Sequence, residues 1–207
     1  MILQRAESLL DTNNFLIKSR KIILASQSKR RIELINLLGL KNIVCENHKV
    51  DEENFKWKKP YSKSILELSE LKARSIQNNK NRNSIIIAGD TMVVRAGKFF
   101  NKTNSTTKIK SYLKTLSGRK HFVYGGLCVL SSSGQAFKRF SKTEVFFNKI
   151  YDYEITEQVL EDGLGKAGGY ALQNFGARFV KKIRGCYTNV IGMSIPELYK
   201  ILKNPEL

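Results

Sequence analysis

Residues 21–39 read KIILASQSKRRIELINLLG and join a short apolar segment to a basic helix. The apolar run at 22–24 predicts a buried strand, and the small polar turn after it predicts a helix start. Apolar residues then recur three apart, so we expect a helix over about 28–38 with one face in a core. Gly39 suits the position just beyond a helix C-terminus.

Three cations, Lys29, Arg30 and Arg31, open this expected helix. Positive side chains at a helix N-terminus oppose the helix dipole, so three in a row favour a negative partner. The backbone N–H groups of a helix start also bind anions such as phosphate. The alternative is that Ser28 caps the helix and the cations are solvated. Spacing alone leaves both interpretations open.

The bulk composition is that of a globular protein, with 207 residues of which 42% are hydrophobic. This length can bury a core as one domain or as two closely joined lobes. We expect residues 1–20 to be an N-terminal appendage and 21–207 to form a single domain of two interleaved lobes. Because no apolar run approaches the ~20 residues of a membrane span, we expect no membrane association. Residues 1–15 lack the pattern of a secretory signal.

The net charge of +18 predicts attraction to polyanions such as nucleotides or nucleic acid. The charges are scattered, however, so a solvated surface and an anion-binding face both remain open. Because no RNA-recognition aromatic motif is evident, nucleic acid is not an expected partner. Cys45, Cys128 and Cys186 form no metal pattern and indicate a reducing compartment, the cytoplasm. A metal bound by carboxylates remains open.

Asp90 lies in the second strongly apolar segment, residues 84–94, SIIIAGDTMVV. The isoleucine run predicts a strand buried on both faces. We expect it to break at Ala88 and Gly89 and to present Asp90 at its carboxyl end, where open α/β sheets place ligand chemistry. The alternative is an aspartate that caps a turn.

Three further polar residues stand in positions that could carry chemistry. Lys72 falls on or beside the apolar stripe of a helix predicted over 62–79, so it either reaches into a cleft or extends to solvent. Glu52 belongs to an acidic cluster in a lysine-rich loop, which could serve a metal or be a solvated bend. Gln173, in the glycine-rich segment 165–179, could hold the edge of a planar ligand or support a turn. Other predicted elements are helices over 106–116, 152–160 and 194–202, and antiparallel strands over 121–130 and 135–150.

Several motifs in a fixed order resemble the Maf family of nucleoside triphosphate pyrophosphatases. They are LASQSKRRIEL (24–34), SELKAR (69–74), AGDTMVV (88–94), LSGRKHFVYGG (116–126), KAGGYALQNFGARFV (166–180) and GCYTNVIGMSIPEL (185–198). The likeness spans about residues 22–202. It implies an α/β fold with an elongated mixed β-sheet flanked by helices, in two lobes around a central cleft. It also implies hydrolysis between the α and β phosphates to a monophosphate and pyrophosphate, assisted by Mg²⁺ or Mn²⁺.

The resemblance also implies roles for individual residues. The residues that match catalytic positions are Asp90, Lys72 and Lys102. Those that match the phosphate-binding turn and substrate-binding positions are Ser26, Ser28, Arg30, Arg31, Thr91 and Gln173. Those that match metal-side carboxylates are Glu52 and Asp90. Because no Ser-His-Asp arrangement is evident, direct attack by water is expected, with Asp90 placing metal and water.

Substrate choice in the family follows three positions, here Arg30, Thr91 and Gln173, which resemble the branch that prefers dTTP and UTP. Lys29 stands where the family has proline, and Thr103 replaces a second proline, which affects loop geometry rather than a catalytic side chain. The alternatives are another nucleotide preference (CTP or modified nucleotides), a non-enzymatic regulator of cell division and septum formation, and a basic nucleic-acid-binding protein. Family members are often dimers, so a homodimer is compatible with the resemblance.

Overall fold

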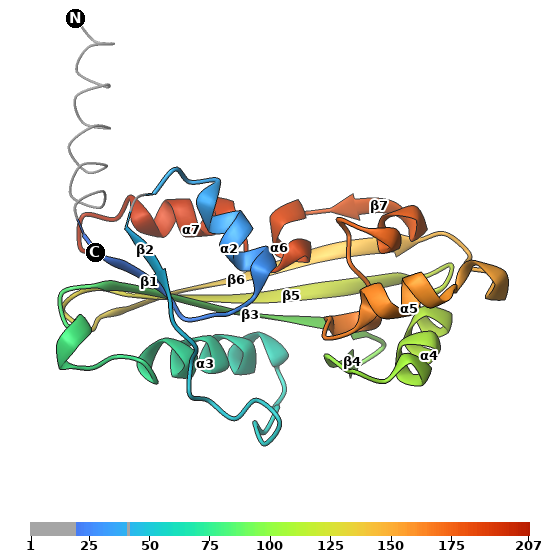
Figure 1. The fold of residues 1–207 in the computed structure, drawn as a ribbon, viewed down its shortest axis with the longest axis horizontal. Coiled ribbons are helices and arrows are strands. Elements are labelled where there is room, and N and C mark those ends of the chain that lie inside the picture. The colour runs from blue at the N-terminus through green and yellow to red at the C-terminus, as the bar shows by residue number, and fades with distance from the viewer. Residues whose placement is uncertain (1–19, 41) are drawn as a thin grey trace, which may run out of the picture. The chain divides into compact units, whose positions relative to one another are not determined.

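The computed structural model describes residues 20–40 and 42–207, which form a mixed β-sheet with helices (Figure 1). The strands pair in the order β2-β1-β3-β5-β6-β7, and β4 pairs with β3. β1 runs parallel to both β2 and β3, whereas β4 and β7 run antiparallel to β3 and β6. The predicted α/β class with a mixed sheet and flanking helices is therefore confirmed.

The bounds of the strands are β1 Ile22–Leu24, β2 Ile43–Cys45, β3 Ile85–Arg95, β4 Lys98–Phe100, β5 Lys120–Leu130, β6 Ala136–Phe147 and β7 Val180–Arg184. The α-helices are α2 Lys29–Asn36, α3 Tyr61–Arg74, α4 Thr106–Leu116, α5 Glu157–Gly163, α6 Tyr187–Ile191 and α7 Ile195–Leu202. The 3₁₀ helices are η1 Asn79–Asn81, η2 Asp152–Glu154, η3 Ala167–Gly169 and η4 Phe175–Phe179. Within these described ranges, none of the helices is both long and apolar enough to cross a bilayer.

The chain divides into two compact units, each assembled from separate segments. Unit 1 holds the described residues up to Asp90, then 126–139 and 195–207. Unit 2 holds 91–125 and 140–194, so the chain passes from one to the other within β3, β5 and β6. The predicted N-terminal appendage lies outside the described residues, apart from Arg20. The proposed single domain over 21–207 remains a prediction.

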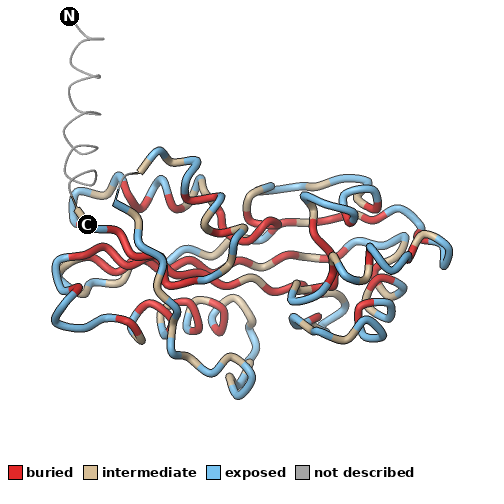
Figure 2. The backbone as a smooth tube through the Cα atoms, in the orientation of Figure 1, coloured by how far each residue is buried: buried red, intermediate tan, exposed pale blue. Residues whose placement is uncertain are grey.

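Unit 1 is built on the parallel pairing of β1 with β3, where Ile22 lies opposite Ile85 and Leu24 opposite Ile87. Successive side chains of a strand point to opposite faces, so an all-apolar strand needs cover on both. Figure 1 shows α3 on one side of these strands and α2 and α7 on the other. The burial colours of Figure 2 show the result, with β1 and the first half of β3 buried throughout.

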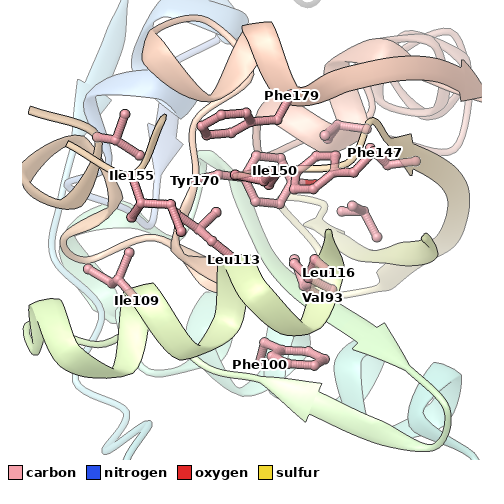
Figure 3. Packing of buried hydrophobic residues seen from close by; sticks show 14 residues of the cluster. Val93, Phe100, Ile109, Leu113, Leu116, Phe147, Ile150, Ile155, Tyr170 and Phe179 are labelled. Carbon is pink, nitrogen blue, oxygen red and sulfur yellow. The ribbon is translucent and has the colours of Figure 1, made fainter. Parts of the chain in front are cut away.

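Unit 2 has its own core, which α4 and α5 share with the first half of β5 and the second halves of β3 and β6 (Figure 3). From α4, Ile109, Leu113 and Leu116 point into this core, spaced as one face of a helix requires. The aromatic rings of Phe147 and Tyr170 meet edge to face at 4.9 Å within it. The predicted helix over 106–116 is confirmed to the residue.

The expected break of the second strand at Gly89 is wrong. β3 continues through Asp90 to Arg95, so Asp90 lies inside the strand rather than beyond its end. Gly89 allows the backbones of β3 and β5 to approach closely, because a Cβ at this position would stand 3.0 Å from the carbonyl oxygen of Gly126. α3 also ends at Arg74, earlier than the predicted limit of 79. The short strands β2 and β7 formed where no regular structure was predicted.

Candidate functional site

A buried ion pair between Lys72 and Asp90 is the centre of the candidate site in unit 1. The Lys72 Nζ atom lies 2.7 Å from Asp90 Oδ1, and both residues are buried. Lys72 falls in the last turn of α3, where a positive charge also complements the helix dipole. Burial of an ammonium and a carboxylate is costly unless the two are paired, so removal of either charge should destabilise the fold.

A close helix–strand contact brings Lys72 to the sheet. A Cβ at Gly126 would stand only 2.4 Å from the carbonyl oxygen of Ile65 and 2.6 Å from Ser69 Oγ. The glycine therefore lets the backbone of α3 rest directly on β5. Ile65 and Lys72 are seven residues apart, which is two helical turns, so they share the face that meets the sheet. The Lys72 side chain is therefore directed inward and does not extend to solvent, which was the alternative prediction.

Glu52 is the second carboxylate that Lys72 contacts. The Lys72 Nζ atom lies 2.9 Å from Glu52 Oε1, and the Glu52 side chain is 31% exposed. The loop that carries it turns at Asp51, whose carboxylate accepts hydrogen bonds from the backbone of residues 53 and 54. The side-chain hydrogen bond from Asn54, followed by its backbone hydrogen bond, lowers the pKa of Asp51. Asp51 therefore shapes the turn, and Glu52 faces the site.

The turn after β1 supplies a hydroxyl, and the first turn of α2 supplies a guanidinium. The Arg31 Nη2 atom lies 3.8 Å from Asp90 Oδ1, and Arg31 Nη1 donates to Ser26 Oγ at 3.4 Å. Ser26 and Arg31 are both buried. Ser28 stands at the N-cap of α2, but its side chain does not form the cap hydrogen bond. The backbone N–H of Ser28 instead donates to Ser26 Oγ at 3.2 Å.

The structure thus brings five of the predicted residues together in unit 1. They are Ser26, Arg31, Glu52, Lys72 and Asp90. Ser28 and Arg30 are half-buried at the start of α2. In unit 2, Thr91 donates from Oγ1 to the carbonyl oxygen of Gly192 at 3.0 Å, while Lys102 and Gln173 are exposed. The functional roles of all these residues remain predictions.

His48 is a member of the site that sequence reasoning missed. Its Nε2 atom lies 3.1 Å from Glu52 Oε1, the same oxygen that contacts Lys72. The i,i+4 spacing to Glu52 was the only available signal, and in a loop that spacing does not place two side chains together. The site therefore contains a chain of contacts from His48 through Glu52 and Lys72 to Asp90, with Arg31 at its far end.

Comparisons with known proteins give matches over most of the chain. Residues 21–205 match the family model described as Maf-like protein. A dTTP/UTP pyrophosphatase of Clostridium perfringens (strain SM101 / Type A) is 34% identical over 189 residues, covering 90% of this chain and 98% of the relative. Another from Thermoanaerobacter sp. (strain X514) is 38% identical over 185 residues, covering 88% and 95%. Among solved structures, a HAM1 protein from Coxiella burnetii is 14% identical, with a TM-score of 0.49 and coverage of 88% and 98%.

Proposed function

The chain belongs to the Maf family, and from that premise we propose that it hydrolyses a nucleoside triphosphate between the α and β phosphates. The products are a nucleoside monophosphate and pyrophosphate. The observation that carries this proposal is the buried Lys72 ammonium, which contacts the carboxylates of Glu52 and Asp90 beside the Arg31 guanidinium. We propose dTTP and UTP as the substrates, since the relatives in Clostridium perfringens and Thermoanaerobacter are named for them.

The charges of the site suit phosphoryl chemistry. Lys72 is a compact point charge, and the guanidinium of Arg31 has a planar set of donors that fits phosphate oxygens. Both are held in place by buried partners before a ligand arrives, so their reorganisation on binding is small. We propose Asp90 as the carboxylate that accepts a proton from the attacking water or orients that water. Water would then displace pyrophosphate directly, and the proton would pass to the carboxylate.

The residues present fit a divalent cation that is bound together with substrate. Lys72 contacts both carboxylates, so Glu52 and Asp90 belong to the same site. Residues 20–40 and 42–207 contain no group of three or more His, Cys, Asp or Glu side chains that could hold a metal ion. Mg²⁺ commonly binds through one or two carboxylates, waters and substrate phosphates, which matches this donor set. Glu52 and Asp90 would hold the ion, which supplies positive charge at the scissile bridge when bound.

The formal charges also argue for added positive charge. Arg31 and Lys72 together balance Glu52 and Asp90, so these four side chains carry no net formal charge among themselves. A triphosphate brings about four negative charges, which need further cations nearby. Arg30 and Lys102 are the protein's candidates, and a divalent cation is the other source. We propose that Arg30, Thr91 and Gln173 select the base, and that Lys102 holds a phosphate.

A nucleotide panel tests this proposal. The purified full-length chain is mixed with dTTP, UTP, CTP and a modified nucleotide, with Mg²⁺, Mn²⁺ or EDTA, and pyrophosphate release is measured. We expect release from dTTP and UTP that EDTA abolishes. Arg30→Ala should change the order of preference among the bases. Equal rates for every nucleotide, or an unchanged preference in Arg30→Ala, would contradict the specificity assignment. A homodimer and a cytoplasmic location also remain predictions.

A further inference from the structure

The sheet of unit 2 has a face on which aromatic and basic side chains alternate. On β5, Lys120, Phe122 and Tyr124 occupy every second position, while His121 and Val123 between them are buried. Because alternate side chains of a strand point to opposite faces, the first three share the face turned away from the unit 2 core. The two aromatic rings are half-buried and the Lys120 side chain is 45% exposed.

The next strand continues the same pattern. On β6, Phe140, Lys142 and Phe146 are again separated by even numbers of residues, and their contacts place them beside the β5 residues. The Tyr124 and Phe140 rings meet edge to face at 5.3 Å, and Lys142 Nζ lies 4.3 Å from the centre of the Phe122 ring. We name the residues Lys120, Phe122, Tyr124, Phe140, Lys142 and Phe146 the aromatic–basic face.

β7 extends this face with two further cations. Lys182 is the cross-strand partner of Phe146, and Arg184 is the partner of Glu144, so these side chains share one face of the sheet. The Arg184 guanidinium lies 5.3 Å from the centre of the Phe146 ring and its side chain is 62% exposed. The acidic residue among them, Glu144, is engaged by Lys120 at 3.2 Å and by Arg184 at 3.9 Å.

The charge and chemistry of this face select one kind of occupant. Four cations against one carboxylate would repel a second copy of the same surface. The aromatic rings lie half-buried in the sheet with their edges packed together, whereas insertion into a membrane interface needs apolar side chains that protrude. A single-stranded polynucleotide offers what both residue types bind: phosphates for the cations, and unpaired bases whose faces stack on aromatic rings.

We propose that the aromatic–basic face of unit 2 binds a single-stranded polynucleotide, a function separate from the proposed hydrolysis. Lys142 lies 4.3 Å from the centre of the Phe122 ring and Arg184 lies 5.3 Å from that of Phe146, so a strand whose bases stack on these rings has cations near its phosphates. An exposed lysine or arginine exchanges a ring contact for a phosphate readily, which opens the ring face to a base. This revises the expectation, drawn from the absence of a familiar motif, that nucleic acid is not a partner.

The test is a binding titration with a fluorescein-labelled 15-nucleotide single strand of mixed sequence that carries a 5′-hydroxyl. EDTA is present throughout. At moderate salt we expect a dissociation constant between roughly 1 and 100 μM, and weaker binding of the duplex of the same sequence, whose base faces are covered. Phe146→Leu, which keeps an apolar side chain but removes the ring, should weaken single-strand binding at least about fivefold. Thermal unfolding shows whether this variant is folded. Phe122→Leu tests a second ring of the face in the same way.

A charge-matched pair of variants separates this face from general basicity. Lys142→Gln/Lys182→Gln should reduce the slope of log K against log salt by about 1.4, as expected for two lost phosphate contacts. Lys108→Gln/Lys110→Gln removes the same charge from exposed positions on α4 and should leave affinity nearly unchanged.

Several results would overturn the proposal. They are equal losses in the two charge variants, equal binding of single strand and duplex, wild-type affinity in both leucine variants, and displacement of the strand by dTTP. Two further results would assign the face to another occupant. One is stronger binding to anionic lipid vesicles than to the strand, and the other is a dimer that Phe146→Leu converts to a monomer.

Discussion

Replacement of Lys72 by methionine tests whether the buried ion pair is the centre of the site. The change removes the ammonium that lies 2.7 Å from Asp90 and leaves that carboxylate buried, with its side chain only 5% exposed. Removal of one partner from a buried ion pair typically costs 3–5 kcal/mol. Arg31 remains 3.8 Å from Asp90, and Glu52 is accessible to water, so we expect the lower end of this range, about 3 kcal/mol.

Urea unfolding at neutral pH measures this loss, and the thermal midpoint should fall by about 6–12 °C for a chain of this length. The control is Lys200→Met, which breaks an exposed ion pair with Glu197 and should cost less than about 1 kcal/mol. The double variant Lys72→Met/Asp90→Asn should recover part of the loss, because the buried carboxylate becomes neutral. The reasoning would be refuted if Lys72→Met cost no more than the surface control, or if the double variant were less stable than the single one.

Further predictions concern the rest of the chain. Gly126→Ala should destabilise the fold by about 2 kcal/mol or more, seen in urea unfolding, because the new methyl group would meet the backbone of α3 at Ile65. Burial lowers the pKa of His121 from 6.5 to about 4, so the unfolded chain binds the proton first as pH falls. Stability should therefore drop by about 3 kcal/mol between pH 6.5 and pH 4, and a His121→Gln variant should lack that part of the pH dependence. Gln173→Ala should raise the KM for dTTP without unfolding the protein, and an unchanged KM would remove this residue from the substrate site.

The elements that could be predicted from sequence were those with a strong local pattern. The helix over 106–116 has apolar residues at helical spacing after a serine that caps it, so local and tertiary preferences agree. Ile22–Leu24 and the isoleucines of β3 similarly have no stable place except inside a sheet. β7 was missed because three of its five residues are charged, and its pairing with β6 is a tertiary contact.

The incorrect break at Gly89 has a physical cause that sequence alone does not show. A glycine in an apolar run marks either a turn or a place where another backbone comes close, and only the fold decides between them. Here it is the close approach of Gly126, with the result that Asp90 lies inside β3. The motif order still singled out Asp90, which the structure places in the candidate site, since motif matching does not depend on where the strand ends.

The contacts within the candidate site were predictable only in part. The resemblance named Glu52, Lys72 and Asp90 together, but it did not predict that one buried ammonium joins the two carboxylates. His48 lies 24 residues before Lys72 in a polar loop, where its i,i+4 spacing to Glu52 does not by itself indicate that the two side chains meet. Such contacts depend on how the loop returns to α3, for example through the hydrogen bond from the Lys49 N–H to Ser75 Oγ.

The most direct test of the central claim is an analysis of products from dTTP with Mg²⁺, for the wild-type chain and for Asp90→Asn. We predict equal amounts of dTMP and pyrophosphate from the wild type. Asp90→Asn should be at least about 100-fold slower, as expected when a general base is lost. Formation of dTDP and inorganic phosphate, or full activity in Asp90→Asn, would contradict the account.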